Sequence, residues 1–188
     1  VIAQNPGTSF NPCLIYGGVG LGKTHLLESI GNYIDEHNPK MKIIYTTAES
    51  FTNEFIDSLL SKEKISAFKS KYRNVDVLLI DDIHFLQKKD STQEELFHTF
   101  NELYDNHKQI VLTCDRPITE LTDITDRLKT RFRKGLNVDL QPPAYETRMA
   151  IAMQKCKEKG YTIDPKVLEF ICQSINTNVR DLEGALTT

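Results

Sequence analysis

Eight consecutive residues near the start of the chain combine four glycines with a lysine and a threonine: Gly17-Gly18-Val19-Gly20-Leu21-Gly22-Lys23-Thr24. They fit the pattern G-x-x-x-x-G-K-[ST] of a phosphate-binding loop. Glycines let the backbone turn tightly enough to aim several N–H groups at one anion, and Lys23 adds a positive charge. An apolar run precedes the segment and a helical pattern follows it, which is the order that the motif requires. A merely tight turn is the less favoured alternative.

We therefore predict that this loop and the start of the next helix bind the phosphates of ATP or ADP. The positive end of the helix dipole would point at the same phosphates, and the Thr24 hydroxyl suits Mg²⁺. The predicted nucleotide contacts are Gly18, Val19, Gly20, Leu21, Gly22, Lys23, Thr24 and His25.

Two carboxylates follow the apolar run Val77–Ile80, which is typical of a buried strand. Ligand sites of parallel sheets lie at the carboxyl ends of the strands. We therefore predict that Asp81 holds Mg²⁺ together with Thr24, and that Asp82 orients or activates the attacking water. Because aspartate is one methylene shorter than glutamate, we predict slow hydrolysis. A solvated strand end is the alternative.

Polar residues also end the next strand-like run, Gln109–Cys114. In such sheets the strand beside the carboxylate strand places a polar group near the γ-phosphate, so Asp115 is the candidate and Thr113 the runner-up. The alternative for Asp115 is a local ion pair with Arg116.

Two arginines outside the strand ends are candidates for stabilising negative charge on the nucleotide phosphates. The segment 126–134 is strongly basic, and an arginine presented to a neighbouring subunit's γ-phosphate would stabilise transition-state charge. We predict this role for Arg131, although a basic run is usually a solvated face. Arg180 opens the last helical pattern, where a positive charge opposes the helix dipole, so we predict that it reaches back to the nucleotide.

Composition limits the class of protein. The chain has 188 residues and a net charge of −3, which excludes a globally basic nucleic-acid binder. There is no transmembrane run and no signal peptide, so we expect no membrane span and a cytoplasmic protein. The absence of an initial Met and the cut-off last helix indicate a fragment of a longer protein. Reduced packing residues are predicted at Cys13, Cys114, Cys156 and Cys172.

Apolar runs alternate with helical patterns, which predicts βαβ units and an α/β fold with a five-stranded parallel sheet. Two helical patterns, Ser50–Leu60 and Ile65–Tyr72, stand where one crossover helix would suffice. We predict a nucleotide-binding αβα subdomain over residues 1–141 and a small all-helical lid subdomain over 142–188. The five expected strands are Cys13–Tyr16, Ile43–Thr46, Val77–Ile80, Ile110–Thr113 and Leu136–Leu140.

These segments together resemble the DnaA family of bacterial chromosomal replication initiators, which are AAA+ ATPases, and the resemblance covers nearly the whole chain. It implies that Asp115 senses the γ-phosphate, that Arg131 is an arginine finger in trans and that Arg180 is the sensor 2 residue in cis. The matching boxes are Tyr16–Leu27, Leu79–Ile83, Glu95–Asn101, Asp115–Pro117, Asp126–Phe132 and Asn178–Ala185.

The resemblance also gives a reason for the doubled helix. It implies an initiator-specific insert, at about residues 48–73, that shapes a spiral filament and faces single-stranded DNA. For the five Lys and Arg residues between Lys62 and Arg73, a solvated helix face is as good an explanation on charge alone. The expected contacts to single-stranded DNA are Ile56, Lys62, Lys64, Lys88 and Lys89.

The function implied is ATP-dependent self-assembly on origin DNA, with unwinding of the origin. Duplex boxes would be read by a domain outside this chain, and the replicative helicase and regulators would bind the full-length protein. A helicase-loader ATPase is the alternative, which helicase binding by this chain alone would favour. A P-loop kinase acting on a metabolite is a third class, but no acceptor pocket is recognisable.

Overall fold

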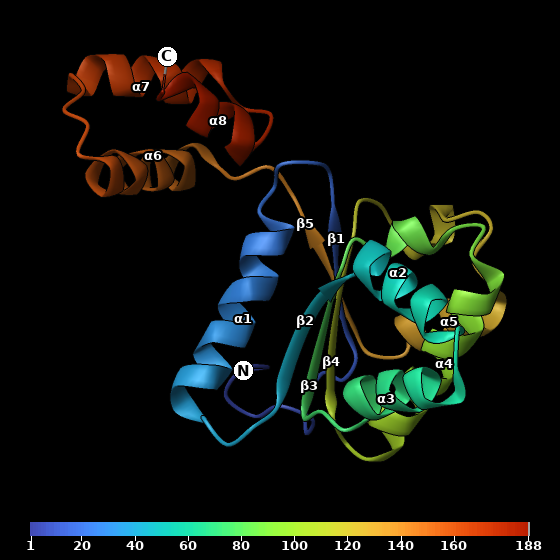
Figure 1. Ribbon diagram of the computed structural model, residues 1–188. Helices are drawn as coiled ribbons and strands as arrows, with labels where there is room; N and C mark the ends of the chain where they lie inside the picture. Colours follow the sequence, from blue (N-terminus) through green and yellow to red (C-terminus); the bar gives the residue numbers. More distant parts are fainter. Residues whose placement is uncertain (188) are drawn as a thin grey trace. The chain divides into compact units, whose positions relative to one another are not determined.

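A computed structural model describes residues 1–187. The chain alternates strands and helices around a five-stranded parallel sheet with the order β2-β3-β4-β1-β5 (Figure 1). This order places β4 between β3 and β1, so that the carboxyl ends of these three strands are neighbours. The strands are β1 (Cys13–Gly17), β2 (Ile43–Thr47), β3 (Val77–Asp81), β4 (Gln109–Cys114) and β5 (Leu136–Leu140).

The central strands are mostly apolar because helices cover both faces of the sheet. Every residue of β3 and β4 is buried, and α1 packs against β3 and β4. Figure 1 shows α1 on one face and α2 to α5 on the other. These helices are α1 (Lys23–His37), α2 (Ala48–Ser58), α3 (Lys62–Arg73), α4 (Asp90–Asp105) and α5 (Asp126–Arg133), with short 3-10 helices η1 (Ile83–Leu86) and η2 (Ile118–Glu120).

The doubled helix is a rigid hairpin that an aromatic cluster holds together. Phe51 of α2 contacts Phe68 and Tyr72 of α3 with ring centroids 5.2 and 4.8 Å apart. Each helix has a side-chain N-cap, in which Thr47 accepts from the Ser50 amide and Ser61 from the Lys64 amide. The two predicted helices are thus confirmed.

The chain divides into two compact units. The first comprises Val1–Tyr16 and Lys23–Asp139, and the second comprises Gly17–Gly22 together with the chain from Leu140 onward. The second unit contains α6 (Tyr145–Lys159), α7 (Pro165–Ser174) and α8 (Val179–Ala185) around its own core of Ala152, Leu168, Cys172 and Leu182. Buried Arg148 supports this core, because it donates to the carbonyls of Cys172 and Pro143.

All five predicted strands are confirmed, since each predicted run lies within an observed strand. The observed division differs from the predicted boundary at 141/142, because the second unit starts at Leu140 and includes the glycine-rich loop. All four cysteines are buried, with free thiols. Among the described residues, no helix has the length and apolar character needed to cross a membrane.

Candidate nucleotide site

The glycine-rich loop has backbone conformations that residues other than glycine rarely adopt. Gly20 and Gly22 have φ values of +77° and +92°, a region in which glycine carries little steric cost. The amides of Val179 and Arg180 donate to the Gly20 carbonyl at 3.0 and 3.3 Å. A Cβ at Gly20 would come within 2.7 Å of the Asn178 side-chain oxygen. The loop is therefore bound to the first turn of α8, the helix that carries exposed Arg180.

Asp81 at the end of β3 receives three hydroxyl groups. Thr24 Oγ1 donates to Asp81 Oδ2 at 2.7 Å, Tyr45 Oη donates to the same oxygen at 3.3 Å, and Thr113 Oγ1 donates to Oδ1. The Asp81 carboxylate is 3% exposed. Burial, and then the charge of Asp81, raise the pKa of Tyr45 to about 12, so Tyr45 remains a donor.

This oxygen-rich setting fits a hard divalent cation such as Mg²⁺, which prefers carboxylate and hydroxyl ligands. The sequence prediction paired Thr24 with Asp81, and the structure brings these two side chains together. It did not include Tyr45. The available signal was its place in β2, since β2 pairs in parallel with β3 and ends beside Asp81.

Asp82 has a left-handed backbone conformation, with φ 56° and ψ 53°. Its amide donates to Thr113 Oγ1 at 2.8 Å, and the same hydroxyl donates to Asp81. Thr113 therefore binds the Asp81 carboxylate and the Asp82 backbone, a contact separate from the predicted runner-up role at the γ-phosphate. Burial, and then the nearby charge of Asp81, raise the pKa of Asp82 above its ordinary value.

Asp115 follows β4 and is held by its neighbour in sequence. Arg116 Nε and Nη2 donate to the two Asp115 oxygens at 2.9 and 2.7 Å, which is the local pair that the sequence left open. These hydrogen bonds hold the pKa of Asp115 below its ordinary value. Asp115 stays ionised beside Asp82 at neutral pH, so a direct approach to a γ-phosphate would require a proton or a bridging donor.

Arg131 lies on α5 and is held in a fixed direction by α4. Its Nε donates to Asn101 Oδ1 at 2.6 Å, and its guanidinium lies over the Phe97 ring at 5.5 Å. Among residues 1–187, its hydrogen bond and its ring contact are with α4 and not with Thr24, Asp81 or Asp82. The Phe97–Asn101 segment was identified in the sequence only by its resemblance to the DnaA family. In the structure it contacts and orients the Arg131 side chain.

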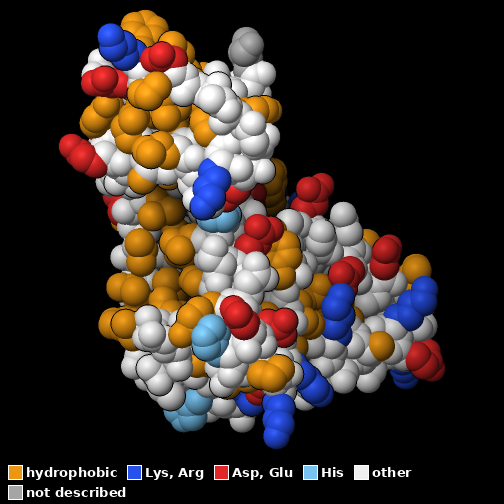
Figure 2. All heavy atoms as spheres, turned by 90° about the vertical axis from the view of Figure 1, so that its left-hand side faces the viewer, with side chains coloured by type: hydrophobic (Ala, Val, Ile, Leu, Met, Phe, Trp, Pro, Cys, Tyr) orange, Lys and Arg blue, Asp and Glu red, His pale blue; other side chains and the backbone are white. Residues whose placement is uncertain are grey.

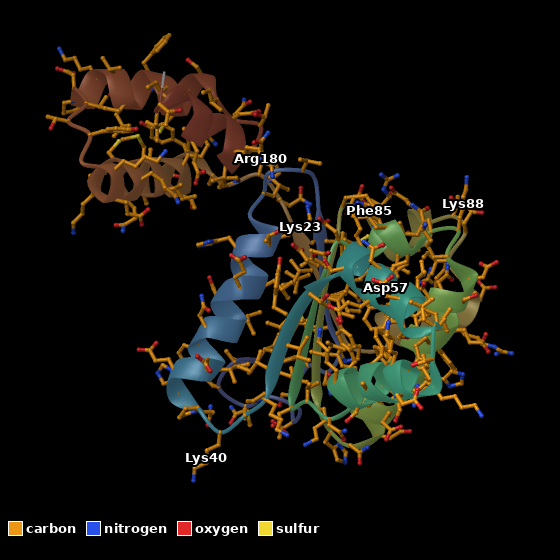
Figure 3. All side chains as sticks on the ribbon, viewed as in Figure 1. Lys23, Lys40, Asp57, Phe85, Lys88 and Arg180 are labelled. Atoms are coloured by element: carbon orange, nitrogen blue, oxygen red, sulfur yellow. The ribbon has the colours of Figure 1, made fainter. Side chains whose placement is uncertain are left out.

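The expected DNA contacts are all exposed, and Ile56 is 52% exposed. Figure 3 labels Lys88, which lies beyond η1 at the end of the domain that carries α2. In the basic run of α3, Lys69, Lys71 and Arg73 form ion pairs with Glu95, Glu54 and Glu95 respectively. No ion pair is found for Lys62 or Lys64 among the described residues.

A P-loop that follows β1, a Thr24–Asp81 pair, a neighbouring carboxylate on β3 and a separate three-helix unit define a P-loop module of the AAA+ class. The comparisons with known proteins specify the class further. The family of bacterial DnaA ATPase domains matches residues 1–139. The chain belongs to this family.

Curated and solved relatives agree with this assignment. The chromosomal replication initiator protein DnaA of Borreliella afzelii is 59% identical over 186 residues, which cover 99% of this chain and 38% of that protein. The chain therefore spans about two-fifths of the length of that relative. Domain III of Thermotoga maritima DnaA is 46% identical with a TM-score of 0.94, over 99% of this chain and 77% of that one.

A third relative was solved with ligands. The structure of replication initiator DnaA bound to AMPPCP and single-stranded DNA is 38% identical, with a TM-score of 0.89, and covers 99% of this chain and 57% of that one.

Proposed function

We propose that the chain is the ATP-binding and slowly hydrolysing AAA+ domain of a replication initiator, which acts as a molecular switch. The observation that carries the proposal is the Thr24–Asp81 hydrogen bond of 2.7 Å at the end of the P-loop. It places a hydroxyl and a carboxylate where the metal of a bound nucleotide would need them.

The residues of this chain have separate tasks in the proposed reaction. The loop amides from Gly18 to Gly22 and the Lys23 ammonium bind the phosphates. Thr24 and Asp81 would hold Mg²⁺, which would supply positive charge to neutralise the charge that develops on the phosphates. Asp82 orients the attacking water. Its short side chain and its place beside Asp81 support slow turnover.

The switch would operate between chains. Arg131, directed by Asn101 and Phe97, would reach the γ-phosphate of a neighbouring chain, and Arg180 would contact the nucleotide in its own chain. Asp115 would register the γ-phosphate through a donor. ATP would then support a filament, and ADP would not.

The filament would engage single-stranded origin DNA through the insert and the loop after η1, and would promote unwinding in the cytoplasm. The relative solved with single-stranded DNA supports this step. Duplex boxes, the replicative helicase and regulators would be bound by the longer protein. The DNA contacts proposed are those expected from the sequence: Ile56, Lys62, Lys64, Lys88 and Lys89.

Titration of a fluorescent ATP analogue and measurement of phosphate release test the proposal. We expect Mg²⁺-dependent binding and slow single-turnover hydrolysis, both of which Lys23→Ala should abolish. Lys40→Ala is the control, because Lys40 lies in the turn after α1, at the opposite end of that helix from Lys23 (Figure 3). Turnover as fast as that of motor ATPases, or equal binding by Lys23→Ala, would contradict the proposal.

A further inference from the structure

Three side chains of metal-ligating type meet beside the proposed Mg²⁺ site. His84 lies in η1, Cys114 is the last residue of β4, and Asp115 follows it. One ligand atom from each residue lies within 4.8 Å of the other two. His84 and Cys114 have no task in the proposed ATPase. Phe85, the next residue after His84, is labelled in Figure 3 and shows where this group sits.

The distances among these atoms are close to those of a tetrahedral zinc site. Zinc binds nitrogen and oxygen at about 2.0–2.2 Å and sulfur at about 2.3 Å, so neighbouring ligand atoms lie about 3.4–3.6 Å apart. His84 Nδ1 lies 3.6 Å from Asp115 Oδ1, and Cys114 Sγ lies 3.9 Å from the same oxygen. Shifts of a few tenths of an ångström would therefore complete these two edges.

A ring nitrogen of His84 also lacks a hydrogen-bond partner within residues 1–187. His84 Nδ1 is buried and has no hydrogen-bond partner among the described residues. The carboxylate oxygens Asp115 Oδ1 and Asp82 Oδ1 lie 3.6 and 3.9 Å from it, both beyond hydrogen-bond length. Buried polar atoms without partners are uncommon, and a bound ion is one of the recognised reasons for them.

We propose that His84, Cys114 and Asp115 form a binding site for a thiophilic divalent cation of the Zn²⁺ class. Asp82 or a water molecule would supply the fourth ligand. The mixture of imidazole, thiolate and carboxylate favours zinc over Mg²⁺ and Ca²⁺, which take oxygen ligands. This site is separate from the all-oxygen pair Thr24 and Asp81.

Binding exchanges protons and contacts in a defined way. The Cys114 thiol releases its proton to solvent as the sulfur binds the metal, and His84 binds through Nδ1. Because the thiol must lose its proton, the affinity should rise with pH. The Arg116 guanidinium opposes the metal, because it donates to both oxygens of Asp115 and must release Oδ1.

The site has a consequence for the ATPase that rests on the proposed function. A bound cation would fix Asp115 and draw Asp82 toward His84, away from the attacking water. The cation would therefore inhibit hydrolysis without blocking the P-loop. Cation binding itself is measured without nucleotide, so failure of the metal site and failure of the ATPase proposal remain distinguishable.

The experiment uses nucleotide-free protein with Co²⁺ and Zn²⁺ as probes. We expect Co²⁺ to give a thiolate-to-metal charge-transfer band with a stoichiometry of about one per chain. Added Zn²⁺ should displace Co²⁺ and abolish the band, and competition with a chromogenic chelator measures the Zn²⁺ affinity. Cys114→Ser should remove the band. His84→Gln should weaken Zn²⁺ binding by more than the roughly 10–100-fold that loss of a supporting outer-shell group costs.

The matched control is Cys13→Ser. Cys13 is also a buried strand cysteine whose pKa burial raises to about 11, and this variant should keep both the band and the affinity. Thermal melts of each variant without metal establish that it is folded. Absence of the charge-transfer band in the folded parent protein, its survival in folded Cys114→Ser, or unchanged Zn²⁺ affinity in folded His84→Gln would each overturn the proposal.

Discussion

The end of β3 and the surface of the insert differ in how completely their side chains are already held. Asp81 is 3% exposed and receives hydroxyl groups from three different elements. The expected DNA contacts Ile56, Lys62 and Lys64 are exposed, and none of them has an ion pair in the described part of the chain. The proposed metal pair is thus held within one chain, whereas the expected DNA contacts are exposed side chains on a helix pair that an aromatic cluster holds together.

The helical unit shows the same contrast on a smaller scale. Arg148 is buried between two carbonyls, but Met153, Val167 and Phe170 are 59%, 49% and 69% exposed. Figure 2 shows hydrophobic side chains gathered on the surface of this unit. The interior polar contacts of this unit are therefore satisfied, while several of its apolar side chains are exposed.

The largest expected effect on hydrolysis comes from Asp81, at the end of β3. Asp81→Asn should lower hydrolysis by about 100-fold or more, because the amide removes the negative charge that holds Mg²⁺. Phosphate release against Mg²⁺ concentration measures the change. Asp76→Asn is the matched control, since Asp76 precedes the same strand but binds Lys108 and the Lys42 amide. Equal Mg²⁺ dependence in both variants would remove Asp81 from the metal site.

The next largest effect tests whether Arg131 acts on the nucleotide of a neighbouring chain. Arg131→Ala should reduce hydrolysis at least about tenfold, given that arginine fingers contribute about 10³–10⁵-fold elsewhere. Asp81→Asn chains still present Arg131, so mixing the two inactive variants should restore part of the turnover. Arg133→Ala, on the same helix, is the control. No recovery on mixing would show that Arg131 does not act in trans.

A smaller effect is expected on the exposed side. Replacing Lys62 and Lys64 together by alanine should reduce the salt dependence of single-stranded DNA binding by about 1.4 units of log K per log salt, or about 0.7 per phosphate contact. Lys71→Ala is the control because Lys71 is paired with Glu54 at 2.6 Å. Anisotropy titrations over several salt concentrations measure the slope. An equal change in both variants would indicate a general charge effect.

The smallest effect concerns pH and stability. The pKa of Asp82 is raised in the folded protein, so ionised Asp82 destabilises the fold once the pH exceeds its unfolded value. Asp82→Asn should therefore raise the free energy of unfolding at neutral pH and change it little near pH 3. We expect less than about 1 kcal/mol, because the side chain is 37% exposed. Thermal melts at both pH values check the sign, and a loss of stability at neutral pH would contradict it.

The sequence predicted the strands and the proximity of Thr24 to Asp81 because both depend on short-range patterns. An apolar run followed by carboxylates indicates a strand end, and the glycine spacing of the P-loop indicates its conformation. What the sequence did not predict depends on neighbouring strands. Thr113 fixes both Asp81 and Asp82, and Tyr45 reaches Asp81 from β2. These contacts follow from strand order, which spacing alone does not specify.

The same limit applies to side chains that meet across helices or turns. Arg131 was predicted from its basic segment, but its orientation depends on Asn101, 30 residues earlier. His84 was not singled out, because one histidine after a strand carries no signal until β4 brings Cys114 and Asp115 beside it. The local pair of Asp115 with Arg116 was an open alternative, and only the side-chain geometry decides it.

The most direct test of the central claim is the anisotropy of labelled single-stranded DNA, titrated with this chain in an ATP analogue and in ADP. If nucleotide is bound within one chain and DNA only by assembled chains, binding should be tight and cooperative with the analogue alone. Arg131→Ala should lose this binding but retain affinity for the nucleotide. Equal DNA binding in both nucleotide states, or its absence in both, would contradict the account.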